Sequence, residues 1–106
     1  MKYLEKISFK KIPIWIGNFV IASYGTGAVM GVPAHDDRDF AFAKKYGLEI
    51  RTVIAPKQWD GKAMDCAYTN TGIQVNSGDF DGLDNATGMK LISDHIESNG
   101  WGRRTV

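Results

Sequence analysis

Residues 24–40 read YGTGAVMGVPAHDDRDF, and this stretch determines the fold and the site that we expect. The triplet Gly25-Thr26-Gly27 is typical of a turn, or of a loop where the backbone approaches another group closely. The apolar run from Ala28 to Val32 predicts a short buried strand that ends at Pro33. A dense charged cluster follows at residues 36–39. A turn, a strand end and fixed charges so close together indicate one small cavity.

Residues 36–47 carry the signals of a helix. Asp36 is a candidate N-cap, and Asp39 falls in the first turn, where a carboxylate suits the positive end of the helix. Gly47 is a natural stop after the last turn. The apolar face is expected to consist of Phe40, Ala43 and Tyr46. Together with strands at 28–32 and 50–54, this helix predicts a β-α-β unit.

The remaining segments complete a mixed α/β fold of short strands with two flanking helices, in a single domain over residues 1–106. Residues 12–22 suggest strand material interrupted at Gly17, and residues 55–72 form a polar connector. Residues 73–75 predict a brief strand, followed by a turn-rich link at 77–83.

The second helix is expected at about residues 85–98. Asp84 or Asn85 would cap it, and Gly100 would end it. Its apolar face would consist of Met89, Leu91, Ile92 and Ile96. The pair Arg103-Arg104 beyond it is interpreted as a solvated end or as the start of a link.

The composition excludes several classes of protein. With 43% hydrophobic residues the chain can bury a core, and its net charge of +1 makes a whole-molecule electrostatic grip on nucleic acid improbable. The single cysteine, Cys66, excludes an internal disulfide, and a buried structural thiol is the expected role. No apolar run approaches the ~20 residues of a membrane-spanning helix, and the charged start does not resemble a signal peptide. We therefore expect a cytoplasmic protein without a membrane partner.

The cluster at residues 35–39 permits several chemistries. One hypothesis is a small metal-dependent hydrolase centred on His35, Asp36 and Asp39, although a structural zinc site is improbable with one cysteine. A nucleophile–base pair of Thr26 and His35 has no supporting motif. Asp36 either caps the helix or takes part in the site. Asp39 is expected to face the end of the 28–32 segment, where it could pair with a ligand ammonium, and Arg38 could bind a phosphate or hold carboxylates.

These residues closely resemble the editing insertion of bacterial-type leucyl-tRNA synthetases. The resemblance is carried by YGTGAVMGVPAHDDRDFAFAKKYGL at 24–48, with IPIWIGNFV at 12–20 upstream and AYTNTG at 67–72 and NSGDFDGL at 76–83 downstream. Isoleucyl and valyl relatives share the short GTG element, but the V-P-A-H-D-x-R-D run looks specific to the leucyl enzymes. The resemblance covers most of the chain.

The resemblance implies hydrolysis of wrongly charged leucine tRNA, such as tRNA carrying norvaline or isoleucine at its 3′ end. One methylene is worth only ~1–3 kcal/mol in a synthetic pocket, so a second selection step is needed. By resemblance, Asp39 anchors the substrate ammonium, and Asp36 joins it as a candidate catalytic residue. The implied substrate-binding residues are Tyr24, Gly25, Thr26, Gly27, Met30, Val32, His35 and Arg38.

Editing in this family is expected to use a positioned water and the substrate hydroxyls, without a metal or other cofactor. ATP serves the synthetic site of the parent enzyme, which this chain does not contain. The implied partners are the 3′ end of mischarged leucine tRNA and the remainder of the synthetase.

The chain also departs from the family pattern. It lacks the threonine-rich, T-R-P-D-T-like segment that forms the opposite pocket wall, and residues 1–11 do not resemble the family's lead-in. We therefore expect the C-terminal half of an editing domain, a fragment with exposed apolar surface that favours self-association. The alternative to an active module is a folded but catalytically inactive structural fragment.

Overall fold

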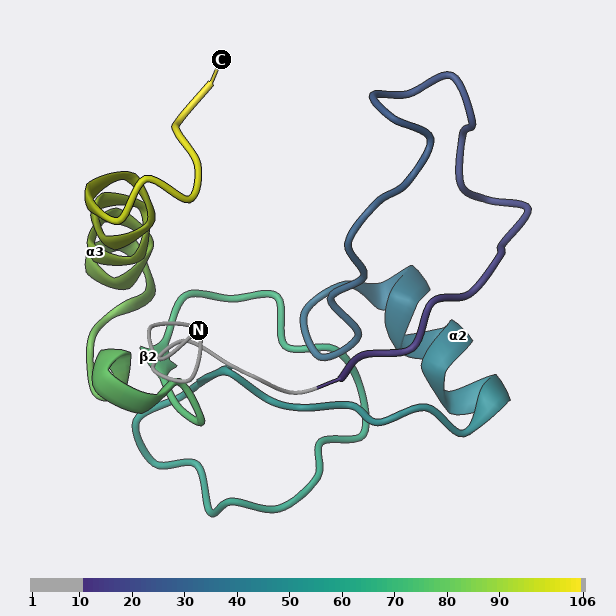
Figure 1. Ribbon diagram of the computed structural model, residues 1–106. Coiled ribbons are helices and arrows are strands. Elements are labelled where there is room, and N and C mark those ends of the chain that lie inside the picture. Colours follow the sequence, from purple (N-terminus) through teal and green to yellow (C-terminus); the bar gives the residue numbers. More distant parts are fainter. Residues whose placement is uncertain (1–10, 106) are drawn as a thin grey trace.

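A computed structural model describes residues 11–105 of the chain (Figure 1). Its elements are α2 (Asp37–Tyr46), β1 (Ile54–Ala55), β2 (Ile73–Gln74), the 3₁₀ helix η1 (Gly78–Phe80) and α3 (Asn85–Ser98). Figure 1 shows α2 and α3 on opposite sides of the molecule, with β2 beside α3. The expected mixed α/β fold with two helices is confirmed. None of the helices in the described part is long and apolar enough to cross a membrane.

Helix α2 begins and ends where the sequence predicts. Asp36 is its N-cap: one side-chain oxygen accepts a hydrogen bond from the backbone N–H of Asp39 at 2.9 Å. At the other end Gly47 adopts a left-handed conformation (φ 66°), and the next N–H, that of Leu48, donates to the Ala43 carbonyl. Ala43 is the buried residue of this helix. Both ends are therefore fixed by local signals.

The sheet consists of one short antiparallel pair. Ile54 lies opposite Gln74, and Ala55 lies opposite Ile73. The ladder continues through a 2.9 Å hydrogen bond from the Val75 N–H to the Val53 carbonyl. Ile73 also forms an isolated bridge with Asp84, the residue that caps α3. The sheet thus connects residues 53–55 directly to the start of the second helix.

Helix α3 packs closely on β2 through a glycine. Its Asp84 cap accepts hydrogen bonds from both the N–H and the hydroxyl of Thr87. A side chain at Gly88 would place its Cβ 1.7 Å from Oε1 of Gln74, whose side chain is buried. Gln74 in turn donates to the Phe80 carbonyl at 2.9 Å. The absence of a side chain at Gly88 allows helix, strand and 3₁₀ turn to meet.

Three strand predictions were wrong. The segments at 12–22 and 28–32 form no strand within residues 11–105, and only Ile54 of the predicted 50–54 strand is in the sheet. The expected β-α-β unit is therefore absent from the described residues, and the pairing observed is antiparallel. A strand needs a neighbour for its N–H and C=O groups. An apolar run alone does not supply one.

The packed core of the described residues is made of small side chains. Ala34, Ala43, Ala55 and Ala67 are its buried apolar residues, whereas Ile14 and Ile16 are 95% and 99% exposed. Trp15 contacts Phe42 and Tyr46, with ring centroids 5.7 and 5.2 Å apart, which places Trp15 against α2. The predicted burial of Cys66 and of Met89 was wrong, since both are exposed.

Arg104, in the segment after α3, contacts that helix. The Arg104 guanidinium contacts the carboxylates of Asp94 and Glu97 and donates to the Lys90 carbonyl. The Arg104 backbone N–H donates to Glu97 at 2.9 Å. Arg104 is exposed, as expected of a solvated end, and it also makes these contacts with α3.

Candidate functional site

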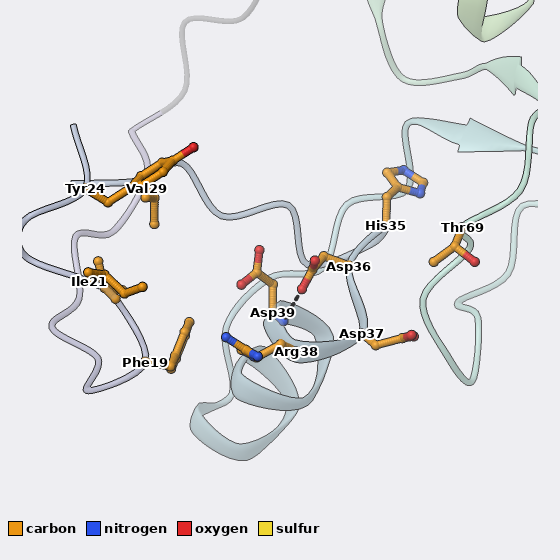
Figure 2. Close-up of a pocket in the computed structure, with 11 residues that line it drawn as sticks. Phe19, Ile21, Tyr24, Val29, His35, Asp36, Asp37, Arg38, Asp39 and Thr69 are labelled. Atoms are coloured by element: carbon orange, nitrogen blue, oxygen red, sulfur yellow. Dashed lines mark hydrogen bonds between the residues drawn. The ribbon is translucent and has the colours of Figure 1, made fainter. Parts of the chain in front are cut away.

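A broad hollow of about 510 Å³ lies at the N-terminal end of α2. Figure 2 shows charged side chains from the start of α2 at its centre. Apolar and aromatic side chains from the preceding loop stand on one side, and a threonine from the polar connector stands on the other. Its lining residues are Phe19, Val20, Ile21, Tyr24, Val29, His35, Asp36, Asp37, Arg38, Asp39 and Thr69.

Asp39 joins the helix to the segment before it. Its Oδ2 accepts a hydrogen bond from the Val32 backbone N–H at 2.8 Å. The same carboxylate passes within 3.8 Å of the point where a Cβ at Gly31 would lie. Asp39 therefore faces the end of the 28–32 segment, as predicted, although that segment is not a strand. Within residues 11–105, the structure shows no partner for the second oxygen, Oδ1.

Asp36 fixes the position of Asp39 through the helix cap. Because the Asp36 carboxylate binds the Asp39 N–H, the first turn of α2 has a defined start (Figure 2). The Asp36 carbonyl accepts the N–H of Phe40 at 2.8 Å, which is the first turn of hydrogen bonding in the helix. The capping role predicted for Asp36 is confirmed.

His35 is held by backbone groups on both ring nitrogens. Nδ1 lies 2.8 Å from the Tyr68 carbonyl oxygen, while the N–H groups of Val53 and Ile54 each donate to Nε2 at 3.2 Å. Two donors directed at Nε2 require that nitrogen to be the acceptor, so Nδ1 carries the proton in the neutral ring. The tautomer follows from the backbone around it.

This geometry does not favour the metal-dependent hydrolase. Nε2 of His35 already accepts two N–H groups, and a metal would need the same lone pair. The part of the chain that the structure describes contains no group of three or more potential ligands among His, Cys, Asp and Glu. The Thr26 hydroxyl accepts from the Ala28 N–H at 3.4 Å, a local contact that leaves the proposed pair with His35 without support.

The glycine loop is a turn beside the hollow. Gly25 and Gly27 have positive φ angles of 57° and 83°, and the Gly27 N–H donates to the Tyr24 carbonyl at 2.9 Å. A Cβ at Gly27 would approach the Ala22 carbonyl oxygen to 2.8 Å, so only glycine fits there without movement. The turn predicted from the sequence is confirmed.

The structure brings together half of the predicted site residues. Tyr24, His35, Asp36, Arg38 and Asp39 line the hollow. The other five do not line it: Gly25, Thr26, Gly27, Met30 and Val32. Met30 is 82% exposed, and the Val32 backbone N–H donates to Asp39.

Sequence reasoning had not assigned six lining residues to the site: Phe19, Val20, Ile21, Val29, Asp37 and Thr69. A signal existed for Thr69, because it lies in a segment that carries the family resemblance. Val29 and the apolar residues at 19–21 lie in such segments or next to one.

The hollow combines three carboxylates with one guanidinium. Asp36, Asp37 and Asp39 line it beside Arg38, whose guanidinium lies 5.7 Å from the centre of the Phe19 ring. Figure 2 shows the Asp39 carboxylate on the side of Tyr24 and Val29. An acidic group beside an apolar wall suits a ligand that carries an ammonium and an aliphatic group together.

Comparison with known families shows which proteins this chain is similar to. A family model described as leucyl-tRNA synthetase, editing domain, matches residues 1–97. The chain belongs to this editing-domain family. The match includes residues 1–11, so the interpretation that these residues depart from the family's lead-in was wrong.

Curated relatives of this editing domain agree. A leucine–tRNA ligase of Dehalococcoides mccartyi (strain CBDB1) is 52% identical over 102 residues, which is 96% of this chain. Leucine–tRNA ligases of Nitratidesulfovibrio vulgaris (strain Miyazaki F) and Shewanella putrefaciens (strain CN-32) are 54% and 52% identical over 92% and 97% of the chain. In each case the matched part is 12% of the relative, so the chain spans only a small share of those enzymes.

Proposed function

We propose that the chain is the part of a leucyl-tRNA synthetase editing domain that binds the aminoacylated 3′ end of mischarged leucine tRNA for hydrolysis. The observation that carries this proposal is the position of Asp39. One of its oxygens is fixed by the Val32 N–H, while Oδ1 has no partner within residues 11–105, and Asp39 lines the hollow. A held carboxylate with one remaining acceptor can receive an ammonium in a defined direction.

The surroundings suit the rest of an aminoacyl ester. Ile21, Val29 and Tyr24 supply apolar and aromatic surface for an aliphatic side chain and for the terminal adenosine. Arg38 lines the same hollow and can contact a phosphate of the tRNA end. The substrate ammonium, side chain and backbone phosphate thus each have a chemically matched neighbour.

In the proposed reaction, water attacks the ester carbonyl carbon, and the bond to the terminal ribose oxygen breaks as that oxygen gains a proton. The products are the free amino acid and the uncharged tRNA. Residues of this chain position the substrate, because the described residues offer no nucleophile paired with a base. We propose that no cofactor takes part, and that ATP serves only the synthetic site of the parent enzyme.

The remaining partner in this proposal is the rest of the synthetase. Orientation of the ester contributes strongly to hydrolysis, and the described residues supply a broad hollow of about 510 Å³. We propose that a threonine-rich segment elsewhere in the enzyme closes it.

The test uses a leucine–tRNA ligase that carries this sequence at the matching segment, called here the complete enzyme. It is incubated with leucine tRNA charged with norvaline, isoleucine or leucine, and release of the amino acid is followed above the spontaneous rate. The proposal expects hydrolysis of the norvaline and isoleucine esters and sparing of the leucine ester. Equal rates on all three esters, or no rate above the spontaneous one, would refute it.

A parallel sample contains the 106-residue chain alone. We expect it to be inactive, because one wall of the site cannot orient the ester and the water together. Selective hydrolysis by the isolated chain would show instead that this segment carries a complete site.

A further inference from the structure

His35 connects three segments that are far apart in the sequence. Its Nδ1–H donates to the Tyr68 carbonyl, and its Nε2 accepts the N–H groups of Val53 and Ile54. A second hydrogen bond joins the same two segments: the Tyr68 N–H donates to the carbonyl of Ala34, the residue before His35, at 2.8 Å. One ring therefore satisfies three backbone groups from partners 18, 19 and 33 residues away.

Two of these segments lead directly into the site. Asp36, the cap of α2, is the next residue after His35, and Thr69, which lines the hollow, is the next residue after Tyr68. Figure 2 shows His35 and Thr69 on the same side of the hollow. A change in the His35 ring position would move both the start of α2 and the Thr69 wall.

The third segment anchors the ring to the sheet. Ile54 begins β1, and its N–H is bound by His35 rather than by the partner strand β2. Val53 is tied to β2 through its carbonyl, which accepts the Val75 N–H. The position of the His35 ring is thus set in part by Val53 and Ile54, and neither of these residues lines the hollow.

We propose that His35 is a positioning residue for editing: as the neutral Nδ1–H tautomer, it holds the Asp36–Asp39 turn and Thr69 at a fixed separation. It acts through Asp36 and Tyr68 and does not contact the reacting ester. This inference rests on the proposed function for its catalytic consequence, but its hydrogen bonds can be tested without any reaction.

Two substitutions separate the two sides of the ring. In His35→Asn the amide nitrogen can take the place of Nδ1 and donate to Tyr68, but nothing accepts from Val53 and Ile54. In His35→Gln the amide oxygen can reach the place of Nε2, but the bond to Tyr68 is lost. His35→Ala removes both sides.

Hydrogen exchange in the complete enzyme tests the structural step. We expect His35→Asn to speed hydrogen exchange in peptides containing Val53 and Ile54. We expect His35→Gln to speed it at Tyr68, whose N–H donates to the carbonyl of Ala34, the residue before His35. His35→Ala should speed both. Unchanged protection at both places in His35→Ala would overturn the proposal.

Kinetics of the same variants test the functional step. With norvaline-charged tRNA we expect His35→Ala to lower kcat for hydrolysis about 10- to 100-fold, with a smaller change in KM, because misplacement of a bound substrate mainly costs rate. His35→Asn and His35→Gln should each recover part of the loss. An unchanged kcat in His35→Ala, in an enzyme whose wild type is active, would refute the positioning role alone. An inactive wild type would refute the proposed function and leave the exchange test standing.

His95 provides the matched control. It is the other histidine of the chain, lies in α3 and contacts the rings of Phe80 and Trp101 away from the hollow. His95→Asn should loosen the end of α3 without changing kcat. A fall in kcat equal to that of His35→Ala would show that general loss of stability explains both, and would contradict the proposal.

Discussion

The Asp39 carboxylate accepts the backbone N–H of Val32 at 2.8 Å, and this bond sets the geometry of the candidate site. It links the first turn of α2 to a segment that no strand partner holds within residues 11–105. Because the acceptor is charged, such a bond is shorter and stronger than a neutral one. Asp39 is therefore fixed by the protein before any ligand arrives, which lowers the cost of ordering it on binding.

Removal of the Asp36 cap should weaken both the helix and the site. Asp36→Ala leaves the Asp39 N–H without its acceptor, and we expect a loss of about 1 kcal/mol in the free energy of unfolding. Urea unfolding of the 106-residue chain measures this. Asp36→Asn keeps a good capping group and should stay close to wild type in stability and, in the complete enzyme, in hydrolysis. A stable Asp36→Asn enzyme as slow as Asp36→Ala would show that the charge itself acts in the reaction.

Gly88→Ala should destabilise the chain, although alanine usually favours a helix interior. The new Cβ would lie 1.7 Å from Oε1 of the buried Gln74 side chain, so Gln74 must move and lose its bond to the Phe80 carbonyl. We expect a loss of roughly 1–3 kcal/mol, measured by urea unfolding. Ala86→Gly, at an exposed position of the same helix, is the control and should cost no more than about 1 kcal/mol. A stabilised Gly88→Ala chain would contradict the packing described here.

Acid should weaken α3 through two exposed carboxylates. Hydrogen bonds from the Thr87 N–H and hydroxyl lower the pKa of Asp84 below its ordinary value of 3.8, and hydrogen bonds from Arg104 and Lys90 lower the pKa of Asp94 in the same way. Since the folded values lie below the unfolded ones, the stabilisation is complete above the unfolded pKa. It is lost as the pH falls through the folded pKa.

Circular dichroism of the 106-residue chain between pH 6 and pH 2 measures this loss. A chain with both Asp84→Asn and Asp94→Asn keeps an N-cap but lacks these two titrating groups, so its helix signal should depend less on pH. Identical acid curves for the two chains would rule out this origin of the acid response.

The isolated chain should associate with itself through the apolar residues before α2. Ile14, Ile16 and Met30 are 95%, 99% and 82% exposed, which is unusual for large side chains in a monomer. Light scattering coupled to size exclusion should give a mass above 11.7 kDa that falls when Ile14 and Ile16 are both replaced by Gln. Met89→Gln, at an exposed position on α3, should leave the mass unchanged. A monomeric wild-type chain would disprove the prediction.

The helices could be predicted because their signals are local. Asp36, Gly47 and Asp84 occupy the cap positions that the sequence indicates, and each acts on residues within one turn. The strands were harder to predict, because a strand at 28–32 depends on a partner elsewhere in the chain. Helical signals need no such partner.

Most of the charged residues of the site were predicted, whereas most of its apolar residues were missed. Asp36, Arg38 and Asp39 follow from one short motif, whereas Phe19 and Thr69 reach the hollow only through the folding of distant segments. The backbone bonds of His35 were also beyond sequence reasoning, since their partners lie at least 18 residues away. No local pattern encodes such contacts.

Binding of the substrate ammonium by Asp39 can be tested by changing the protein and the substrate together. The complete enzyme is given leucine tRNA charged either with norvaline or with its 2-hydroxy analogue, and kcat/KM is measured relative to the spontaneous hydrolysis of each ester. The protein change is Asp39→Asn, whose amide oxygen can still accept the Val32 N–H while the charge is removed.

A hydrogen bond to a charged group contributes about 1.5–3 kcal/mol, or roughly 10- to 100-fold in kcat/KM. We predict that either change alone lowers kcat/KM by this amount, and that both together cost little more than one, because they remove the same contact. Losses that simply multiply would show that Asp39 and the ammonium act independently, and that Asp39 does not bind the ammonium.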